Sequence, residues 1–280
     1  MAVKIITDSL SDVTSDLAEE FGVTVVPLTV LFGHEQYLDR VTITTDEFYS
    51  RLVNGDIWPT STQPTPAAFA EVYNETLNET DEILVITVSS RLSGTYQSAI
   101  GAKNMIEKSG RIEVIDSEKV AMGLGLIVIS AARRAKAGAG LDELITYVKG
   151  AINRSHFIVY FDNLTYLAKG GRIGKAKELM GSVLSVKQIL TIKDGEMAPL
   201  TRKRSLAAGM DYLYQNMNAF SHIEELAVEH TTTPGEADKL AERLKSVVGD
   251  KRIFRSTVSP VLGVYGGPGA IATTVLEAER

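Results

Sequence analysis

Residues 83–98 read ILVITVSSRLSGTYQS and contain the most informative pattern in the chain. The first six residues, Ile83–Val88, form an apolar run rich in β-branched side chains, which predicts a buried strand. From Tyr96 onward the pattern favours a helix over residues 96–107. The serines and threonines between the two therefore lie where a strand turns into a helix.

This hydroxyl-rich turn fits two interpretations. Backbone N–H groups are unsatisfied at the start of a helix and the helix dipole favours negative charge there, so such a turn is a natural anion site. Gly94 would let a ligand approach the backbone closely, and Ser93 and Thr95 would add donors. The same residues would also serve as an ordinary N-cap with spare hydroxyls.

The first half of the chain alternates strand and helix patterns. We expect strands at Val3–Thr7, Val23–Leu31, Ile83–Val88 and Ile112–Ile115, and helices at Thr14–Phe21, Thr65–Leu77, Tyr96–Glu107 and Glu118–Ala137. Strands separated by helices of this length predict a parallel α/β sheet, in which ligands bind outside the carboxyl ends of the strands. The polar clusters Thr7–Ser9, Thr87–Ser90 and Asp116–Ser117 follow three of these strands, so we expect them to converge.

The second half shows a mixed order of elements. We expect strands at Ile158–Phe161, Glu225–His230 and Arg252–Ser256, helices at Ala176–Leu184, Ser205–Phe220 and Gly235–Val247, and a hairpin of Gln188–Lys193 with Met197–Thr201. Asp194-Gly195 between the hairpin strands is a strong type I′ turn signal. We therefore predict a Rossmann-like α/β domain over residues 1–152 and a mixed α+β domain over residues 153–280.

Composition narrows the class of protein. The chain has 280 residues, a net charge of −6 and no cysteine, which argues against broad nucleic-acid binding and excludes disulfides and thiolate chemistry. The four histidines lack metal-ligand spacing, so we expect no metal. The N-terminus turns polar too early for a signal peptide, and no apolar run reaches the roughly 18 residues that span a bilayer. We expect a cytoplasmic protein that is not integral to a membrane.

Motifs for catalysis are incomplete. The segment KGGRIGK, Lys169–Lys175, departs from the phosphate-binding loop pattern because Ala176 follows its last lysine. Ser93 lacks the Gly-x-Ser-x-Gly context of a hydrolase nucleophile. Asp8 and Asp116 fit either an acid/base pair or simple caps of the turns after their strands. The basic residues of the loop, with Arg202 to Arg204, fit either a patch for an acidic partner or a solvated surface.

Several segments together are similar to the DegV family of bacterial fatty-acid-binding proteins. They are Ile6–Ser9, Thr62–Pro64, Ser89–Ala99, Ile115–Ser117, Leu164–Gly174, Asp194-Gly195 and Gly266–Gly269. They occur in the family's order and span nearly the whole chain. The resemblance implies two α/β domains with a fatty acid at their interface, its acyl chain in an apolar tunnel and its carboxylate among hydroxyl groups.

The resemblance also implies roles for single residues. Ser93 would be the main donor to the carboxylate, with the Gly94 backbone beside it, and Ser61 the second donor. The family usually has threonine and then serine where this chain has Ser61 and Thr62. Tyr265 stands where members commonly carry a histidine, and a phenol donates a hydrogen bond but carries no positive charge. Arg172 and Arg202 lie in segments that would face a partner.

As a member of that family, the protein would be the lipid-carrier subunit of a bacterial fatty acid kinase. It would hold a long-chain fatty acid for a separate kinase subunit, with no cofactor and no catalytic residues of its own, and would contact a membrane surface at most transiently. Two alternatives stay open. One is an enzyme that binds a small phosphorylated metabolite at Ser93-Gly94-Thr95 with Asp8 or Asp116 as the base, and the other is a regulatory protein with an empty tunnel.

Overall fold

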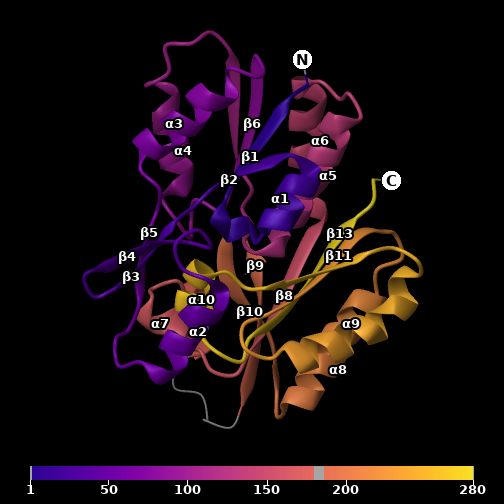
Figure 1. Ribbon diagram of the computed structural model, residues 1–280. Coiled ribbons are helices and arrows are strands. Elements are labelled where there is room, and N and C mark those ends of the chain that lie inside the picture. Colours follow the sequence, from indigo (N-terminus) through magenta and orange to yellow (C-terminus); the bar gives the residue numbers. More distant parts are fainter. Residues whose placement is uncertain (1, 180–185, 280) are drawn as a thin grey trace.

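A four-stranded parallel sheet forms the centre of the first half (Figure 1). The computed structural model describes residues 2–179 and 186–279. The strand order is β2-β1-β6-β7, with β1 at Lys4–Asp8, β2 at Val23–Val26, β6 at Glu82–Thr87 and β7 at Arg111–Asp116. All of the pairings are parallel. The parallel α/β sheet predicted from the sequence is therefore confirmed.

A six-stranded mixed sheet organises the second half. Its order is β10-β9-β8-β13-β11-β12, over Glu196–Lys203, Lys187–Lys193, Ser155–Phe161, Ile271–Glu277, Ile223–His230 and Ile253–Thr257. Only β11 and β12 pair in parallel among the described strands of this sheet. The β9–β10 hairpin turns at Asp194 and Gly195, which both have positive φ, and this confirms the type I′ prediction.

A small antiparallel sheet reaches from the first half towards the second. Its order is β4-β3-β5, with β3 at Thr29–Phe32, β4 at Glu35–Leu38 and β5 at Thr60–Thr62, and α2 at Thr45–Asn54 follows β4. The single strand predicted over Val23–Leu31 is wrong. The chain leaves the parallel sheet at Pro27, which has no N–H to donate, and β3 then pairs in a different sheet.

The remaining helices lie around the three sheets. They are α1 Ser15–Phe21, α3 Pro66–Thr76, α4 Thr95–Lys103, α5 Met122–Lys136, α6 Leu141–Arg154, α7 Thr165–Lys169, α8 Leu206–Asn218, α9 Pro234–Val248 and α10 Pro260–Gly266, with 3₁₀ turns η1 at Ser9–Ser11 and η2 at Gly174–Leu179. The helix predicted over Ala176–Leu184 is therefore a 3₁₀ turn as far as Leu179, and residues 180–184 of that prediction lie outside the described residues. None of the described helices is long and apolar enough to cross a membrane.

Helix α5 lies between the two large sheets. It contacts β1 on one side and β8, β11 and β13 on the other, and its side chains are buried from Met122 through Ala132. A helix that is apolar on every face requires such a position. The helix predicted from Glu118 begins instead at Met122, because Glu118 and Ala121 have positive φ. The boundary predicted between residues 152 and 153 falls in the last turn of α6, immediately before β8, and it stays a prediction.

Close packing around α5 generates a stability prediction. A Cβ atom on Gly125 would lie 2.3 Å from the backbone oxygen of Ser11, so we expect Gly125→Ala to lower the free energy of unfolding by about 1–3 kcal/mol. A Cβ atom on Gly150, on the exposed side of α6, would meet nothing within 4 Å. Gly150→Ala should therefore stabilise the protein by about 0.5–1 kcal/mol. Urea unfolding of both variants checks this, and equal effects would contradict the packing argument.

Candidate ligand-binding site

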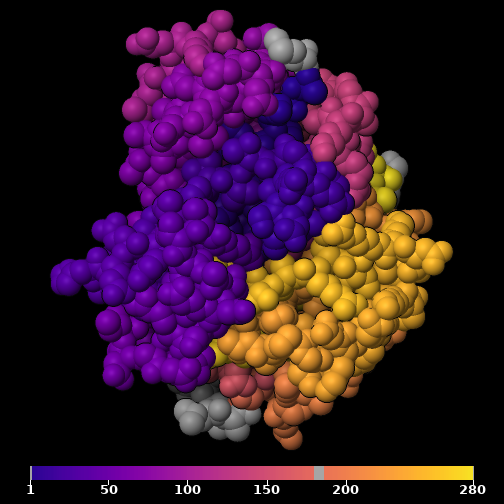
Figure 2. Space-filling view, in the orientation of Figure 1, coloured from indigo at the N-terminus to yellow at the C-terminus, as the bar shows by residue number. Residues whose placement is uncertain are grey.

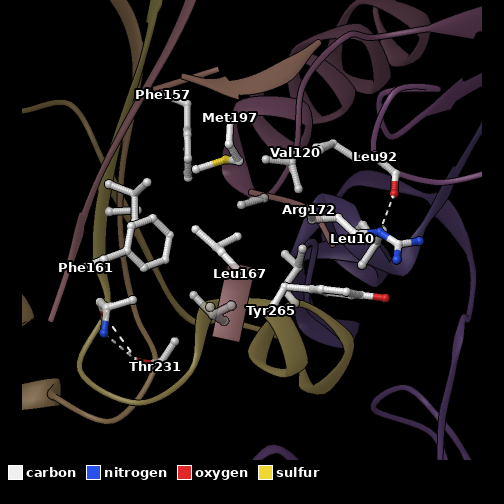
Figure 3. A pocket seen from close by; sticks show the side chains of 17 residues that line it. Leu10, Leu92, Val120, Phe157, Phe161, Leu167, Arg172, Met197, Thr231 and Tyr265 are labelled. Atoms are coloured by element: carbon white, nitrogen blue, oxygen red, sulfur yellow. Dashed lines mark hydrogen bonds between the residues drawn. The ribbon is translucent and has the colours of Figure 1, made fainter. Parts of the chain in front are cut away.

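An apolar cavity lies between the two halves of the chain (Figure 3). Seventeen residues drawn from both halves of the chain line it. The first half contributes Leu10, Leu92, Val120 and Ala121, and the second half contributes Phe157, Val159, Phe161, Leu167, Met197, Val258, Leu262, Ala270 and Ala272. Such a lining suits a hydrocarbon chain.

A second, more polar cavity adjoins the first. It is lined by Ser61, Thr62, Gln63 and Ser93, among others. Leu10, Leu92, Arg172 and Tyr265 line both cavities. The apolar space therefore continues into a space that is bordered by hydroxyl and amide groups.

Ser93 and Gly94 form the turn before α4. The Ser93 hydroxyl lies 2.8 Å from that of Thr95 and accepts a 3.3 Å hydrogen bond from the Thr95 backbone N–H. The N-cap residue of α4 is Gly94, however, and it provides no side-chain cap, so the Ser/Thr capping interpretation is wrong for this helix. Gly94 does not line the polar cavity, but a Cβ atom there would lie 2.4 Å from the side-chain amide of Gln63. The glycine thus lets Gln63, which the sequence analysis missed, lie against the turn.

Ser61 and Tyr265 meet across the polar cavity. Ser61 lies in β5, and its hydroxyl is 2.7 Å from that of Tyr265 in α10. The Tyr265 ring packs against Gly170, where a Cβ atom would lie only 2.3 Å from the ring. Figure 3 shows the Tyr265 hydroxyl pointing away from Phe161 and Leu167. Tyr265 therefore offers its ring to the apolar cavity and its hydroxyl to the polar one.

The two arginines predicted to face a partner have different surroundings. Arg172 is exposed yet lines both cavities, and its guanidinium donates to the carbonyl oxygens of Leu92 at 3.1 Å and Gly170 at 2.8 Å. It also lies 5.0 Å from the centre of the Tyr265 ring. Arg202 is exposed on β10 and lines neither cavity. A partner-facing role stays a prediction for both.

The polar clusters that end the parallel strands converge as turn caps. The Asp8 carboxylate accepts hydrogen bonds from the backbone of Leu10 at 3.0 Å and Val88 at 2.8 Å, and burial raises its pKa to about 7. Asp116 accepts from the backbone N–H groups of Ser90 and Glu118. Neither carboxylate lines either cavity, which favours capping over an acid/base pair. The described residues contain no group of three or more potential ligands arranged for a metal ion.

The contact between Ser61 and Tyr265 can be measured by a double-mutant cycle. We expect Ser61→Ala and Tyr265→Phe to show a coupling of about 0.5–1.5 kcal/mol in the free energy of unfolding, because each change removes the same half-buried hydrogen bond. Denaturant unfolding of the two single variants and the double variant gives this value. Strictly additive effects would show that the hydroxyls do not interact.

Comparison with known proteins agrees with this architecture. A family model described as "Uncharacterised protein, DegV family" matches residues 2–278. A DegV domain-containing protein from Caldanaerobacter subterraneus subsp. tengcongensis is 37% identical over 272 residues, which cover 96% of each chain.

Solved structures share the fold over nearly the full length. A DegV family protein from Thermus thermophilus, described by its fatty acid binding, has a TM-score of 0.92 at 29% identity and covers 99% of this chain and 100% of its own. A stearic-acid-binding protein from Eubacterium ventriosum has a TM-score of 0.86 at 26% identity over 98% of each chain. Because the sequence match runs from residue 2 to residue 278 and the fold agrees throughout, the chain belongs to the DegV family.

Proposed function

We propose that this protein binds a long-chain fatty acid, with the acyl chain in the apolar cavity and the carboxylate in the polar one. The observation that carries the proposal is the junction of these two spaces at Tyr265. The relatives from Thermus thermophilus and Eubacterium ventriosum, which are described as binding fatty acid and stearic acid, support it.

The two cavities would contribute differently to binding. Burial of a methylene group yields about 0.8 kcal/mol, so a chain of about 15 methylenes contributes on the order of 12 kcal/mol before ordering costs. A hydrogen bond to a charged group adds only about 1.5–3 kcal/mol. The acyl chain would therefore supply most of the affinity, and the head-group contacts would set orientation and favour acids over alcohols or esters.

The hydroxyl groups of the polar cavity suit a carboxylate because they form pairs. In each of the pairs Ser61–Tyr265 and Ser93–Thr95, one hydroxyl donates to the other. The accepting hydroxyl of each pair then keeps its own proton free, and in the second pair this proton faces the cavity when Ser93 accepts, because Thr95 does not line the cavity. A carboxylate, which only accepts, would receive these protons from two sides, with Thr62 and the Gly94 backbone beside them. A phenol cannot carry a positive charge, so Arg172 would supply it on the cavity wall.

We further propose that the protein is a carrier without catalytic groups of its own, which acts in the cytoplasm and presents the fatty acid to a separate kinase. The motifs Ser89–Ala99 and Lys169–Gly174 support this role through the family resemblance. Arg172 also supports it, because one side chain borders the cavity and is exposed to solvent. Arg172 and the exposed Arg202 would then belong to the surface that a kinase contacts.

The proposal predicts a co-purifying lipid. We expect the organic extract of freshly purified, denatured protein to contain a fatty acid in near-stoichiometric amount, because burial of the chain makes release slow. Mass spectrometry of the extract identifies the ligand and its chain length. If the extract holds no lipid and a panel of fatty acids gives no thermal shift, fatty-acid binding is excluded, and an enzyme for a small anionic metabolite becomes the working hypothesis.

The head-group contact predicts the effect of a single hydroxyl. We expect Ser93→Ala to weaken fatty-acid binding about tenfold to a hundredfold, since one hydrogen bond to a charged group is lost. Ser90→Ala is the matched control, because Ser90 is exposed in the same turn and does not line either cavity. Titration with a fluorescent fatty acid measures both affinities. Equal affinities for the two variants would reject Ser93 as the anchor of the carboxylate.

A further inference from the structure

A cluster of buried acidic side chains lies between the two halves, apart from both cavities. Asp12 follows η1, Asp39 follows β4, and Glu229 lies in β11; all three are at most 2% exposed. Arg40 is their cationic neighbour, with an ion pair to Asp12 at 3.2 Å. Three carboxylates against one guanidinium would leave two uncompensated negative charges in the interior, which is a costly arrangement.

The cluster holds the segment that leads into α10. Asp12 accepts a 2.9 Å hydrogen bond from the Ser259 backbone N–H, and Arg40 donates to the backbone oxygen of Thr257. Tyr49 of α2 donates to the Val258 backbone oxygen at 3.0 Å. Side chains of the first half thus fix three consecutive backbone positions of the second half, directly before the helix that carries Tyr265.

Two carboxylate oxygens of this cluster, Oδ2 of Asp12 and Oδ1 of Asp39, lack a donor among the described residues. Within the described part of the chain, Oδ2 of Asp12 is buried and receives no hydrogen bond from an N–H group or a hydroxyl, and the carboxyl groups of Asp12 and Glu229 lie within hydrogen-bonding reach of each other. Two carboxylates only accept hydrogen bonds, so this contact requires a proton on one of them. Asp12 already has a cation and a backbone N–H as partners, whereas Glu229 has only the Met122 backbone N–H and the Ser256 hydroxyl.

We propose that Glu229 is a protonated carboxylic acid at neutral pH and donates its proton to Oδ2 of Asp12. The resulting bridge joins β11 of the second half to the η1 turn of the first half and holds the start of α10 in place. Glu229 is thereby a positioning residue for the wall of both cavities, since Val261, Leu262 and Tyr265 of α10 line them.

The electrostatic surroundings agree with this assignment. Burial, together with the charge of Asp12, raises the pKa of Glu229 well above its usual value, and burial raises the pKa of Asp39 to about 7. The groups that face Glu229 or its partner are Asp12, Asp39, Arg40 and Tyr49, with Met122 of α5 and Ser256 of β12 as neutral contacts. Arg40 is the only cation among these groups.

The pH dependence of stability follows from the raised pKa of Glu229. Between the pKa of the unfolded chain, about 4.3, and the raised pKa of the fold, the folded state binds more protons than the unfolded state. The contribution of Glu229 to the free energy of unfolding therefore falls as the pH rises between these two pKa values. Glutamine has the shape of a protonated glutamate, accepts from Met122 and donates to Asp12, but cannot ionise. Glu229→Gln should keep the bridge at every pH.

The test compares melting temperatures of the full chain between pH 5 and pH 8, without added lipid. We expect the difference in melting temperature, Glu229→Gln minus wild type, to rise by at least about 3 °C from pH 5 to pH 8. A shift of one unit in the pKa of Glu229 on folding produces a change of about this size. Glu229→Ala should be destabilised at every pH. Glu143→Gln, an exposed change on α6, should keep a constant difference from the wild type.

Three outcomes would overturn the bridge: a pH-independent difference for Glu229→Gln, a Glu229→Gln variant as unstable as Glu229→Ala, or one that does not fold. None of these measurements depends on added fatty acid. Failure of the wild type to bind lipid would therefore reject the proposed function, whereas the bridge is judged from the melting temperatures alone.

Discussion

Burial of α5 between two sheets is the constraint on which the rest of the structure depends. Its side chains from Met122 to Ala132 are apolar or small and buried, so neither sheet alone could cover them. The helix therefore fixes the distance between the two halves. The residues just before it, Val120 and Ala121, line the apolar cavity, and its first backbone N–H is bound by Glu229. Helix α5, which packs between the two sheets, therefore also determines where the apolar cavity lies.

The site exists because distant segments cross between the halves. The small sheet and α2 lie against α10, and Figure 2 shows this early part of the chain, in violet, beside the orange and yellow C-terminal elements. Through that crossing β5 brings Ser61 to Tyr265, 204 residues away in sequence. Leu92 and Arg172 complete the junction from two further loops. No local segment contains the site, so its geometry depends on the packing of the whole chain.

Local chemistry explains which features were predictable from the sequence. The parallel strands follow from short β-branched runs, and the hairpin follows from Asp194-Gly195, whose positive φ values few other dipeptides accept. The cavity-lining role of Gln63 and the hydrogen bond from the Val88 backbone to Asp8 depend on partners remote in sequence. Glu229 follows the apolar run Leu226–Val228 in β11 and carries a charged side chain of the kind that is usually exposed, yet it is fully buried. Periodicity reports which side chains share a face, but not what covers that face.

The carboxylate of a bound ligand and the carboxyl of Glu229 would differ in charge because they differ in burial. A ligand carboxylate in the polar cavity would meet half-buried hydroxyls and an arginine that is exposed to solvent, so it could stay ionised there with neutral donors around it. Glu229 is fully buried and lies beside the carboxylate of Asp12. Both features favour the protonated form of Glu229 over the ionised form. The two arrangements complement each other. An ionised head group needs hydrogen-bond donors in fixed positions at the polar cavity. The neutral bridge behind α10 holds Tyr265 in place there without adding another charge to the interior.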